Sequence, residues 1–237
     1  MARLPRIYMQ GCAQHVVQRG NNRSVCFYTD ADYAFYLQKL QEAARTHQVA
    51  IHAFVLMTNH VHLLVTPASE SGISSMMQAL GRSYVRYINI MYRRTGTLWE
   101  GRYKASLVSS DAYFLAVMRY IEMNPVRARL VTCPHAHPWS SYRHNGMGKT
   151  IRLITEHALY QRLGETRAAR MRAYRLLFDH ELSSPLVENI RQCINKEWVV
   201  GNDEFNRQIE AACKRKINSG KWGGDRKSVG FKKNQVL

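Results

Sequence analysis

The sequence predicts an α+β fold, in which helices pack over one face of an antiparallel sheet and a helical extension follows. Three observations predict it: β-like runs alternate with helical segments over the first 145 residues, two of these runs flank a short turn at Thr58 and Asn59, and the later sequence has a helical pattern. With 237 residues and 46% hydrophobic content, the chain is long enough to bury a substantial core.

Apolar spacing and turn residues place the individual elements. Thr58 and Asn59 are expected to form the turn of a hairpin that Pro67 closes. The expected strands cover residues 13–18, 25–28, 49–57, 61–65 and about 104–109. The expected helices run over residues 30–46 and 73–94 and begin again at Asp111, because apolar residues recur three and four positions apart.

A change in composition divides the chain. Between residues 132 and 150, proline and glycine interrupt the pattern, which indicates a boundary. Beyond it, helices are expected at about 155–163, 165–180, 186–196 and 203–215. The residues from Lys214 on are basic and rich in glycine, as is typical of a flexible tail. We therefore predict a core (1–145), a helical C-terminal region (146–213) and a flexible basic tail (214–237).

The charge balance indicates a polyanionic partner. The 34 Lys and Arg residues oppose 17 Asp and Glu residues, which gives a formal net charge of +17. Such self-repulsion favours a nucleic acid as partner and leaves an anionic membrane surface as the alternative. Because no segment approaches the roughly 18 apolar residues of a membrane span, no insertion into a membrane is expected.

The cysteines indicate a reducing compartment. The five cysteines are scattered and never occur in C-x-x-C spacing, which argues against a disulfide framework and against a structural zinc site. The opening MARLPRIYMQ lacks the apolar core of a signal peptide. We expect a cytoplasmic protein that is associated with the nucleoid.

Two histidines form the sharpest local motif. On a strand, His60 and His62 lie two positions apart and therefore point to the same face, while Val61 and Leu63 enter the core. Two neutral imidazoles on one face can bind a divalent cation. The alternative is a pair of half-buried histidines without a ligand. His135 and His137 have the same spacing, but they lie between two prolines with no apolar strand around them, so a loop is predicted there.

A tyrosine near the end of a predicted helix is the candidate nucleophile. Tyr120 and Asn124 are four residues apart and share a helix face, and Pro125 limits how far the helix can continue. A tyrosine hydroxyl that attacks a phosphodiester forms a covalent phosphotyrosine link and needs cationic groups to stabilise charge on the phosphate. The alternative is that Tyr120 is a core aromatic, and Tyr113 is the nearest competitor for the catalytic role.

Several motifs together resemble one family. VLMTNHVHLLV, LWEGRYKASLV and YIEMNPVRARLV resemble the single-tyrosine HUH transposases (histidine, hydrophobic residue, histidine). YMQGCAQHVVQRGNNR and PWSSYR resemble one branch of that family, the REP-associated tyrosine transposases. The resemblance covers roughly residues 3–145 and continues more loosely into VVGNDEFNRQIEA. The tail departs from it, because relatives often end in a Gly-Arg-Pro-rich segment that is absent here.

The resemblance implies a fold, a reaction and a site. It implies a ferredoxin-like or RRM-like core, the HUH endonuclease core, whose central strand carries His60 and His62 as metal ligands. It implies Tyr120 as nucleophile, Asn124 completing the metal site, and Mg²⁺ or Mn²⁺ as cofactor. The implied substrate is single-stranded DNA with hairpin-forming palindromic repeats, which is cleaved to a 5′-phosphotyrosine and a free 3′-OH and then rejoined. Both monomers and homodimers are consistent with it.

Three clusters are expected to contact DNA. Arg19, Asn21, Asn22 and Arg23 combine guanidinium groups with amides that can pair with base edges. Arg102, Tyr103 and Lys104 place an aromatic ring that can stack on a base between two phosphate-binding cations. Arg82, Arg86 and Arg93 lie off the apolar stripe of their helix and can face phosphates. For each cluster the alternative is a solvated basic surface, and for Trp99 a core position is an alternative to stacking on a base.

Three other functions remain open. A replication-initiator-type nicking enzyme would share the site and the chemistry but would not join the cleaved end to a different strand. A non-catalytic nucleic-acid-binding regulator would bind in a salt-sensitive way and would be indifferent to EDTA. A zinc-stabilised structural domain would unfold with chelators, but cysteine ligands are missing.

Overall fold

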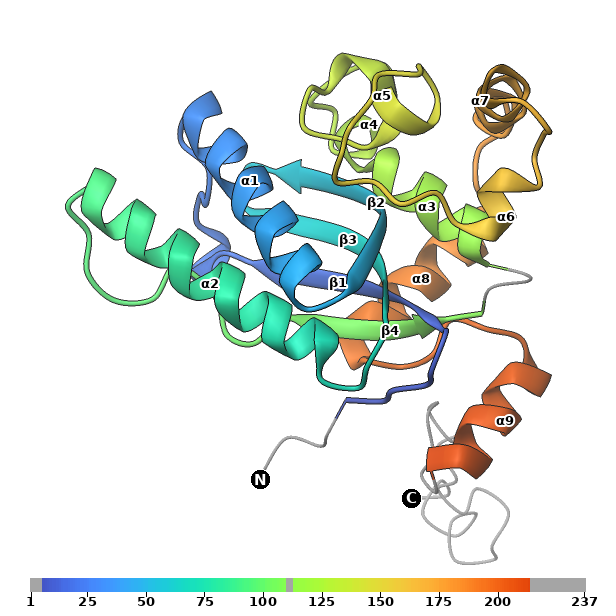
Figure 1. Cartoon of the computed structure of the whole chain (residues 1–237), viewed down its shortest axis with the longest axis horizontal. Helices are drawn as coiled ribbons and strands as arrows, with labels where there is room; N and C mark the ends of the chain where they lie inside the picture. The colour runs from blue at the N-terminus through green and yellow to red at the C-terminus, as the bar shows by residue number, and fades with distance from the viewer. Residues whose placement is uncertain (1–5, 110–112, 214–237) are drawn as a thin grey trace, which may run out of the picture.

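Four antiparallel strands form the central sheet of the computed structural model, which describes residues 6–109 and 113–213 (Figure 1). The strands are β1 (Ala13–Arg19), β2 (Val49–Met57), β3 (His60–Pro67) and β4 (Lys104–Val108). Their order across the sheet is β2-β3-β1-β4, and all three pairings are antiparallel. With one helix after β1 and one after β3, this is the β-α-β-β-α-β arrangement of a ferredoxin-like core. The predicted α+β fold is confirmed.

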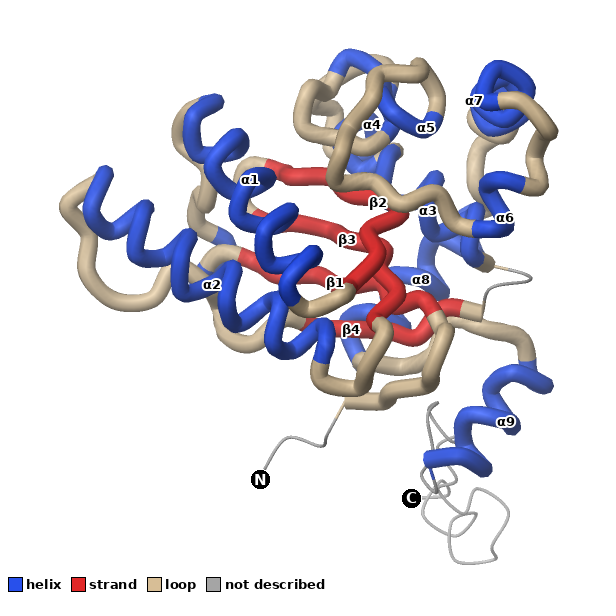
Figure 2. The backbone as a smooth tube through the Cα atoms, in the orientation of Figure 1, coloured by secondary structure: helices blue, strands red, loops and turns tan. Residues whose placement is uncertain are grey.

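Two long helices, α1 (Asp30–Thr46) and α2 (Gly72–Met91), cover one face of the sheet, as predicted. Figures 1 and 2 show both helices lying in front of the strands, side by side. Asp32, buried near the start of α1, accepts hydrogen bonds from the Tyr87 and Tyr92 hydroxyl groups at 3.0 and 2.8 Å and so ties α1 to the end of α2.

The opposite face of the sheet is covered by later helices. The helix α3 (Phe114–Glu122) packs against β2 and β3, whereas α8 (Ser184–Lys196) packs against β4 and β1. Figure 2 shows both behind the sheet in the view where α1 and α2 lie in front. The remaining helical elements are η1 (Asn21–Arg23), α4 (Asn124–Arg127), η2 (Pro134–Ala136), α5 (Tyr142–Asn145), α6 (Ala158–Gln161), α7 (Arg167–Leu176) and α9 (Asp203–Cys213).

Strand alternation separates two cores and positions the site. Val16, Val61 and Leu63 point into the core beneath α1 and α2. Their neighbours on the same strands point to the other face, where Leu64 joins residues of α3 and of the C-terminal helices in a second core. His60 and His62 share this second face with Leu64, since side chains two positions apart lie on the same side of a strand.

A buried carboxylate fastens the C-terminal region to α3. Glu122 is fully buried, and its two oxygens accept hydrogen bonds from the Ser141 hydroxyl at 2.6 Å, the Asn145 amide at 2.8 Å and the Tyr174 hydroxyl at 2.8 Å. Burial raises the pKa of Glu122 to about 7, although these three hydrogen bonds oppose the rise. The residues after 140 therefore share hydrogen bonds as well as a core with the helix that carries Tyr120.

Several boundaries differ from the expectations. The strand predicted at residues 25–28 is wrong, because the amides of Cys26 and Phe27 both donate to the Thr58 carbonyl instead of alternating along a partner strand. The helix predicted to Arg94 ends at Met91, and α6 and α7 are shorter than predicted. The expected helix start at Asp111 and the basic tail (214–237) lie outside the described residues.

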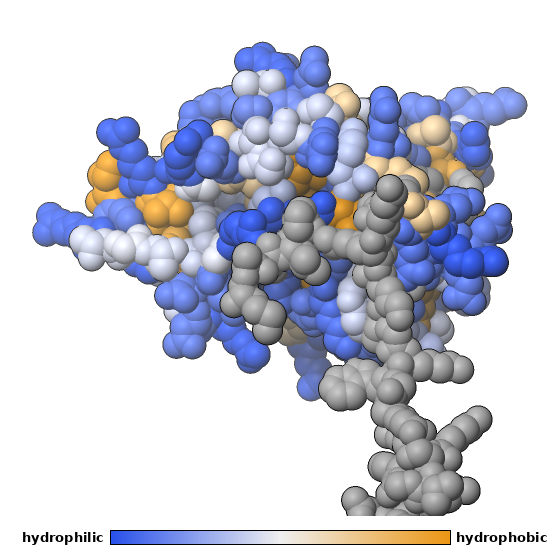
Figure 3. Space-filling model, turned by 90° about the horizontal axis from the view of Figure 1, so that it is seen from below, coloured by the Kyte–Doolittle hydropathy of each residue, from blue (hydrophilic) through white to orange (hydrophobic). Residues whose placement is uncertain are grey.

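One face of the molecule is predominantly polar. Figure 3 shows hydrophilic residues over most of the face that it presents, with apolar residues at the end where α2 ends and in smaller areas elsewhere. Ile90 and Met91 near that end are 66% and 59% exposed. In the described part of the chain, no helix combines the length and the apolarity needed to cross a membrane.

Candidate active site

A cavity of about 490 Å³ lies over the second face of the sheet, between α3 and α8. We call it the Tyr120 cavity. It is lined by Val17, Arg19, Met57, His60, His62, Glu100, Gly101, Arg102, Lys104, Tyr120, Asn124, Arg127, Ala128, Arg191, Ile194 and Asn195. The structure thus brings together the two motif histidines, the candidate nucleophile, Asn124 and three of the predicted DNA-binding cations.

The pairing of β3 with β1 places the two motif histidines beside the C-terminal end of β1. His62 lies opposite Val17 and His60 lies opposite Arg19 on β1. The two imidazole ring centroids are 5.0 Å apart with an interplanar angle of 77°. The ring of Tyr120 reaches down from α3, with its centroid 6.1 Å from that of His62. One chain therefore supplies the phenol and both imidazoles to a single cavity.

Hydrogen bonds orient both imidazoles through the same ring nitrogen. His60 Nδ1 lies 2.7 Å from Asn59 Oδ1, and because that oxygen can only accept, Nδ1 carries the proton and Nε2 keeps its lone pair. His62 Nδ1 lies 2.8 Å from His15 Nε2, so it can donate in the same way. This is the pattern of metal-binding histidines, which donate one ring N–H to a neighbour and bind the cation through the other nitrogen.

Burial keeps these histidines neutral. Desolvation lowers the pKa of His60 to about 4 and that of His15 to about 3, assisted by the charges of Arg19 and Arg127 respectively. Desolvation also lowers the pKa of His62 well below its usual value, and nearby His60, His15 and arginines add to the effect. Uncharged imidazoles have the lone pair that a cation requires.

The cavity residues can bind a divalent cation, but they supply only part of its ligands. Among the described residues, no three His, Cys, Asp or Glu side chains gather to hold a metal, so the imidazoles of His60 and His62 make up the nitrogen donors. Asn124 can add its amide oxygen, because its Nδ2 already donates to the carbonyls of Tyr120 and Ile121 at 3.0 and 3.3 Å. Imidazole suits Mn²⁺ better than Mg²⁺, and the remaining positions can be taken by phosphate oxygens and water.

Arg127 places a positive charge beside the candidate nucleophile. A helix break at Met123, before Pro125, starts the short helix α4 and turns Arg127 back toward α3. The Arg127 guanidinium carbon lies 4.2 Å from the centroid of the Tyr120 ring, and the guanidinium donates to the Tyr120 carbonyl. Burial lowers the pKa of Arg127 to about 10, which still leaves it charged at neutral pH.

Comparison with known proteins relates part of this chain to a family. A family model described as "Transposase IS200 like" matches residues 8–124, the segment that contains both cavity histidines, Tyr120 and Asn124. The core of this chain belongs to the IS200-like transposase family. The family predicted from the sequence motifs is thereby confirmed.

Solved structures share the fold of this transposase core. A REP-associated tyrosine transposase, solved bound to a REP hairpin, is 18% identical with a TM-score of 0.55, and the match covers 66% of this chain and 93% of that one. A protein from Deinococcus radiodurans R1 is 20% identical with a TM-score of 0.36, and the match covers 51% of this chain and 96% of that one. No protein with a curated description matches this sequence.

Other predicted DNA-binding residues lie outside the cavity of this transposase. Asn21, Asn22 and Arg23 form the exposed turn η1, which follows Arg19 at the same edge of the sheet. Arg82 and Arg86 are exposed on α2, on the opposite face of the sheet.

Two aromatic candidates are buried in the core beneath α1 and α2. Tyr103 is 8% exposed and Trp99 is 6% exposed. The guanidinium of Arg6 also covers the Tyr103 ring, at 3.7 Å from its centroid. Neither ring is available to stack on a base in this structure.

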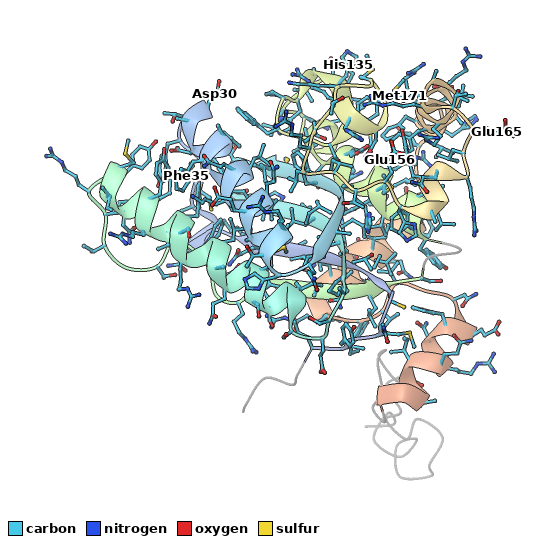
Figure 4. The ribbon with its side chains drawn as sticks, viewed as in Figure 1. Asp30, Phe35, His135, Glu156, Glu165 and Met171 are labelled. Carbon is cyan, nitrogen blue, oxygen red and sulfur yellow. The ribbon has the colours of Figure 1, made fainter. Side chains whose placement is uncertain are left out.

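The competing histidine and tyrosine candidates are placed elsewhere. His135 lies beside α5, away from the strands (Figure 4), and its Nε2 contacts Cys133 Sγ at 3.2 Å. His137 donates from Nε2 to the Leu56 carbonyl at 2.9 Å, so the two rings have separate partners. The loop predicted here contains the short 3-10 helix η2, which includes His135 and ends before His137. Tyr113 precedes α3 and does not line the Tyr120 cavity.

Sequence reasoning missed three residues of this site. His15 lies two positions before the cavity residue Val17 on β1, so the two side chains point to the same face of the sheet. The alternation of side chains along a strand could have predicted this. Arg127 lies seven residues after Tyr120, a spacing that places two residues on one side of a helix. Arg191 had no local signal, because only the packing of α8 brings it to the cavity.

Proposed function

We propose that this transposase cleaves and rejoins single-stranded DNA near hairpin-forming palindromic repeats, through a covalent link between Tyr120 and a 5′-phosphate. The observation that carries the proposal is the convergence of one phenol, two oriented imidazoles and several cations on the Tyr120 cavity. The hairpin-bound REP-associated transposase, which has the same fold, supports the choice of substrate.

The proposed reaction is a transesterification at phosphorus. Tyr120 Oη attacks the scissile phosphorus, the bond from phosphorus to the 3′ oxygen breaks, and the leaving 3′ oxygen takes up a proton to become a 3′-OH. The phenolic proton passes to a base in the site or to water. Rejoining is the reverse, in which a 3′-OH attacks the phosphotyrosine and releases Tyr120. The phosphotyrosine link stores the energy of the broken bond, so no external energy source is required.

The residues of the cavity have distinct proposed roles. His60 and His62, with Asn124, would hold Mg²⁺ or Mn²⁺, which when bound supplies Lewis-acid stabilisation of charge on the phosphate. Arg127 places a fixed positive charge beside the attacking phenol, where negative charge develops. Arg19, Arg102 and Lys104 line the same cavity and would bind the neighbouring phosphates of the strand.

The test is covalent capture followed by strand transfer. Wild-type protein incubated with end-labelled hairpin DNA and Mn²⁺ should give an adduct that survives boiling in detergent and carries the label 3′ to the break. EDTA should prevent it. A second unlabelled strand should then acquire the labelled segment, whereas a nicking enzyme would stop at the adduct. Binding without any adduct would favour the non-catalytic regulator instead.

The hydrogen bond that orients His60 predicts an effect on cation affinity. Asn59→Ala removes the acceptor of His60 Nδ1–H, so the Mn²⁺ affinity of the DNA-free protein should fall by about tenfold or more, which isothermal titration can measure. Asn59→Asp keeps an acceptor at this position and should retain the affinity. Equal affinities of Asn59→Ala and the wild type would contradict the role given to His60.

A further inference from the structure

The helix α8 forms one wall of the Tyr120 cavity, although it lies far beyond the family-matched segment. The matched segment ends at residue 124, whereas α8 spans Ser184–Lys196 and contributes Arg191, Ile194 and Asn195 to the lining. The cavity that holds the candidate nucleophile is therefore completed by residues that the family model does not include.

The position of α8 is fixed on two sides. Its apolar face buries Ile190, Cys193 and Ile194. The chain that follows it continues along β4, where the Val200 amide donates to the Leu107 carbonyl and the Ser109 amide donates to the Val200 carbonyl, both at 2.8 Å. At the cavity itself, Lys104 Nζ donates to the Asn195 carbonyl at 3.2 Å. The wall is thus anchored to the sheet.

Two arginines approach the cavity from different elements. Arg127 comes from α4 and Arg191 comes from α8, and the charge of Arg191 contributes to lowering the pKa of Arg127. No carboxylate of a described residue forms an ion pair with either guanidinium. Glu100 also lines the cavity but forms no ion pair with these arginines, so an anion placed between the two like charges would relieve their repulsion.

We propose that α8 is a DNA-binding wall of the active site, in which Arg191 binds a backbone phosphate of the strand that enters the cavity. The proposal rests on the proposed function and extends it to a part of the chain outside the family-matched segment. A guanidinium suits this task because its planar donors pair with two phosphate oxygens at once. The phosphate that Arg191 binds would lie beside the scissile one, so α8 would fix the register of the strand relative to Tyr120.

The test is binding of a fluorescent single-stranded oligonucleotide in EDTA, measured by anisotropy over a salt series. Arg191→Gln should weaken binding by about tenfold or more, as expected for one lost charge-assisted phosphate contact. The slope of log affinity against log salt should become shallower by about 0.7, the value for one phosphate of a single strand. Arg172→Gln removes the same charge from an exposed position on α7 and should leave both quantities close to wild type.

Two further measurements separate the possible outcomes. Arg191→Lys keeps the charge but loses the planar donors, so its affinity should fall between those of wild type and Arg191→Gln, and thermal melting should show all variants folded. If Arg191→Gln binds as Arg172→Gln does, the proposal is overturned, even when wild-type protein forms the Tyr120 adduct. If Arg191→Gln weakens binding but wild type forms no adduct, the α8 wall stands and the cleavage function fails.

Discussion

Replacing Tyr120 with phenylalanine is expected to abolish the covalent protein–DNA adduct, with a loss of at least about a thousandfold. The substitution removes only the hydroxyl oxygen that would attack phosphorus. The phenyl ring that remains keeps its contacts with the His62 ring and the Arg127 guanidinium, so the fold and the cavity should be preserved. The measurement is the amount of labelled DNA that stays attached to protein after boiling in detergent, with DNA binding in EDTA as a separate readout.

Tyr113→Phe is the matched control for this experiment. Tyr113 precedes the same helix and is partly buried, but it does not line the cavity. Its variant should form the adduct as wild type does. An adduct formed equally by Tyr120→Phe would show that another residue is the nucleophile, and loss in both variants would point to a defect of the helix instead.

Removing the buried carboxylate of Glu122 is expected to lower the free energy of unfolding by about 3–5 kcal/mol. Glu122→Ala leaves buried donors on Ser141, Asn145 and Tyr174 with fewer or no acceptors and opens a cavity between α3 and the C-terminal helices. For a chain of this length, the corresponding fall in melting temperature is about 10 °C. Chemical denaturation followed by circular dichroism measures the free energy of unfolding.

Glu188→Ala provides the comparison for Glu122→Ala. Glu188 is exposed on α8 and accepts one hydrogen bond, from the Gln192 amide at 3.1 Å. Its replacement should change the free energy of unfolding by less than about 0.5 kcal/mol. Similar small effects for both variants would mean that the C-terminal helices do not depend on Glu122 for their attachment.

The part of the site that the sequence predicts is the part set by local periodicity. A strand alternates every second residue, so His60 and His62 had to share a face once β3 was recognised. The turn at Thr58 and Asn59 fixed the hairpin, and helical spacing placed Tyr120 and Asn124 together. These predictions needed no knowledge of which elements pack against each other.

The site residues that the sequence did not predict were missed for two reasons. Some are placed by packing between distant segments, and others by the alternation of side chains along a strand, which was overlooked. The contact from His15 to His62 needs the register in which Val17 pairs with His62. Arg191 needs α8 to dock beside β4. Tyr103, in contrast, could have been placed from the sequence. It directly precedes Lys104, and neighbouring side chains in extended chain point to opposite faces, so the ring and the lysine could not belong to one DNA-binding surface.

The late position of α8 in the chain has a consequence for biosynthesis. Ribosomes deliver the polypeptide from its N-terminus, so the histidines and Tyr120 emerge and can fold before Arg191 has been translated. A nascent chain that has reached residue 145 would expose the phenol and the imidazoles on one side, with no helix over β4 and β1. The full affinity for a DNA strand would then be reached only after α8 has been translated and has packed against β4 and β1.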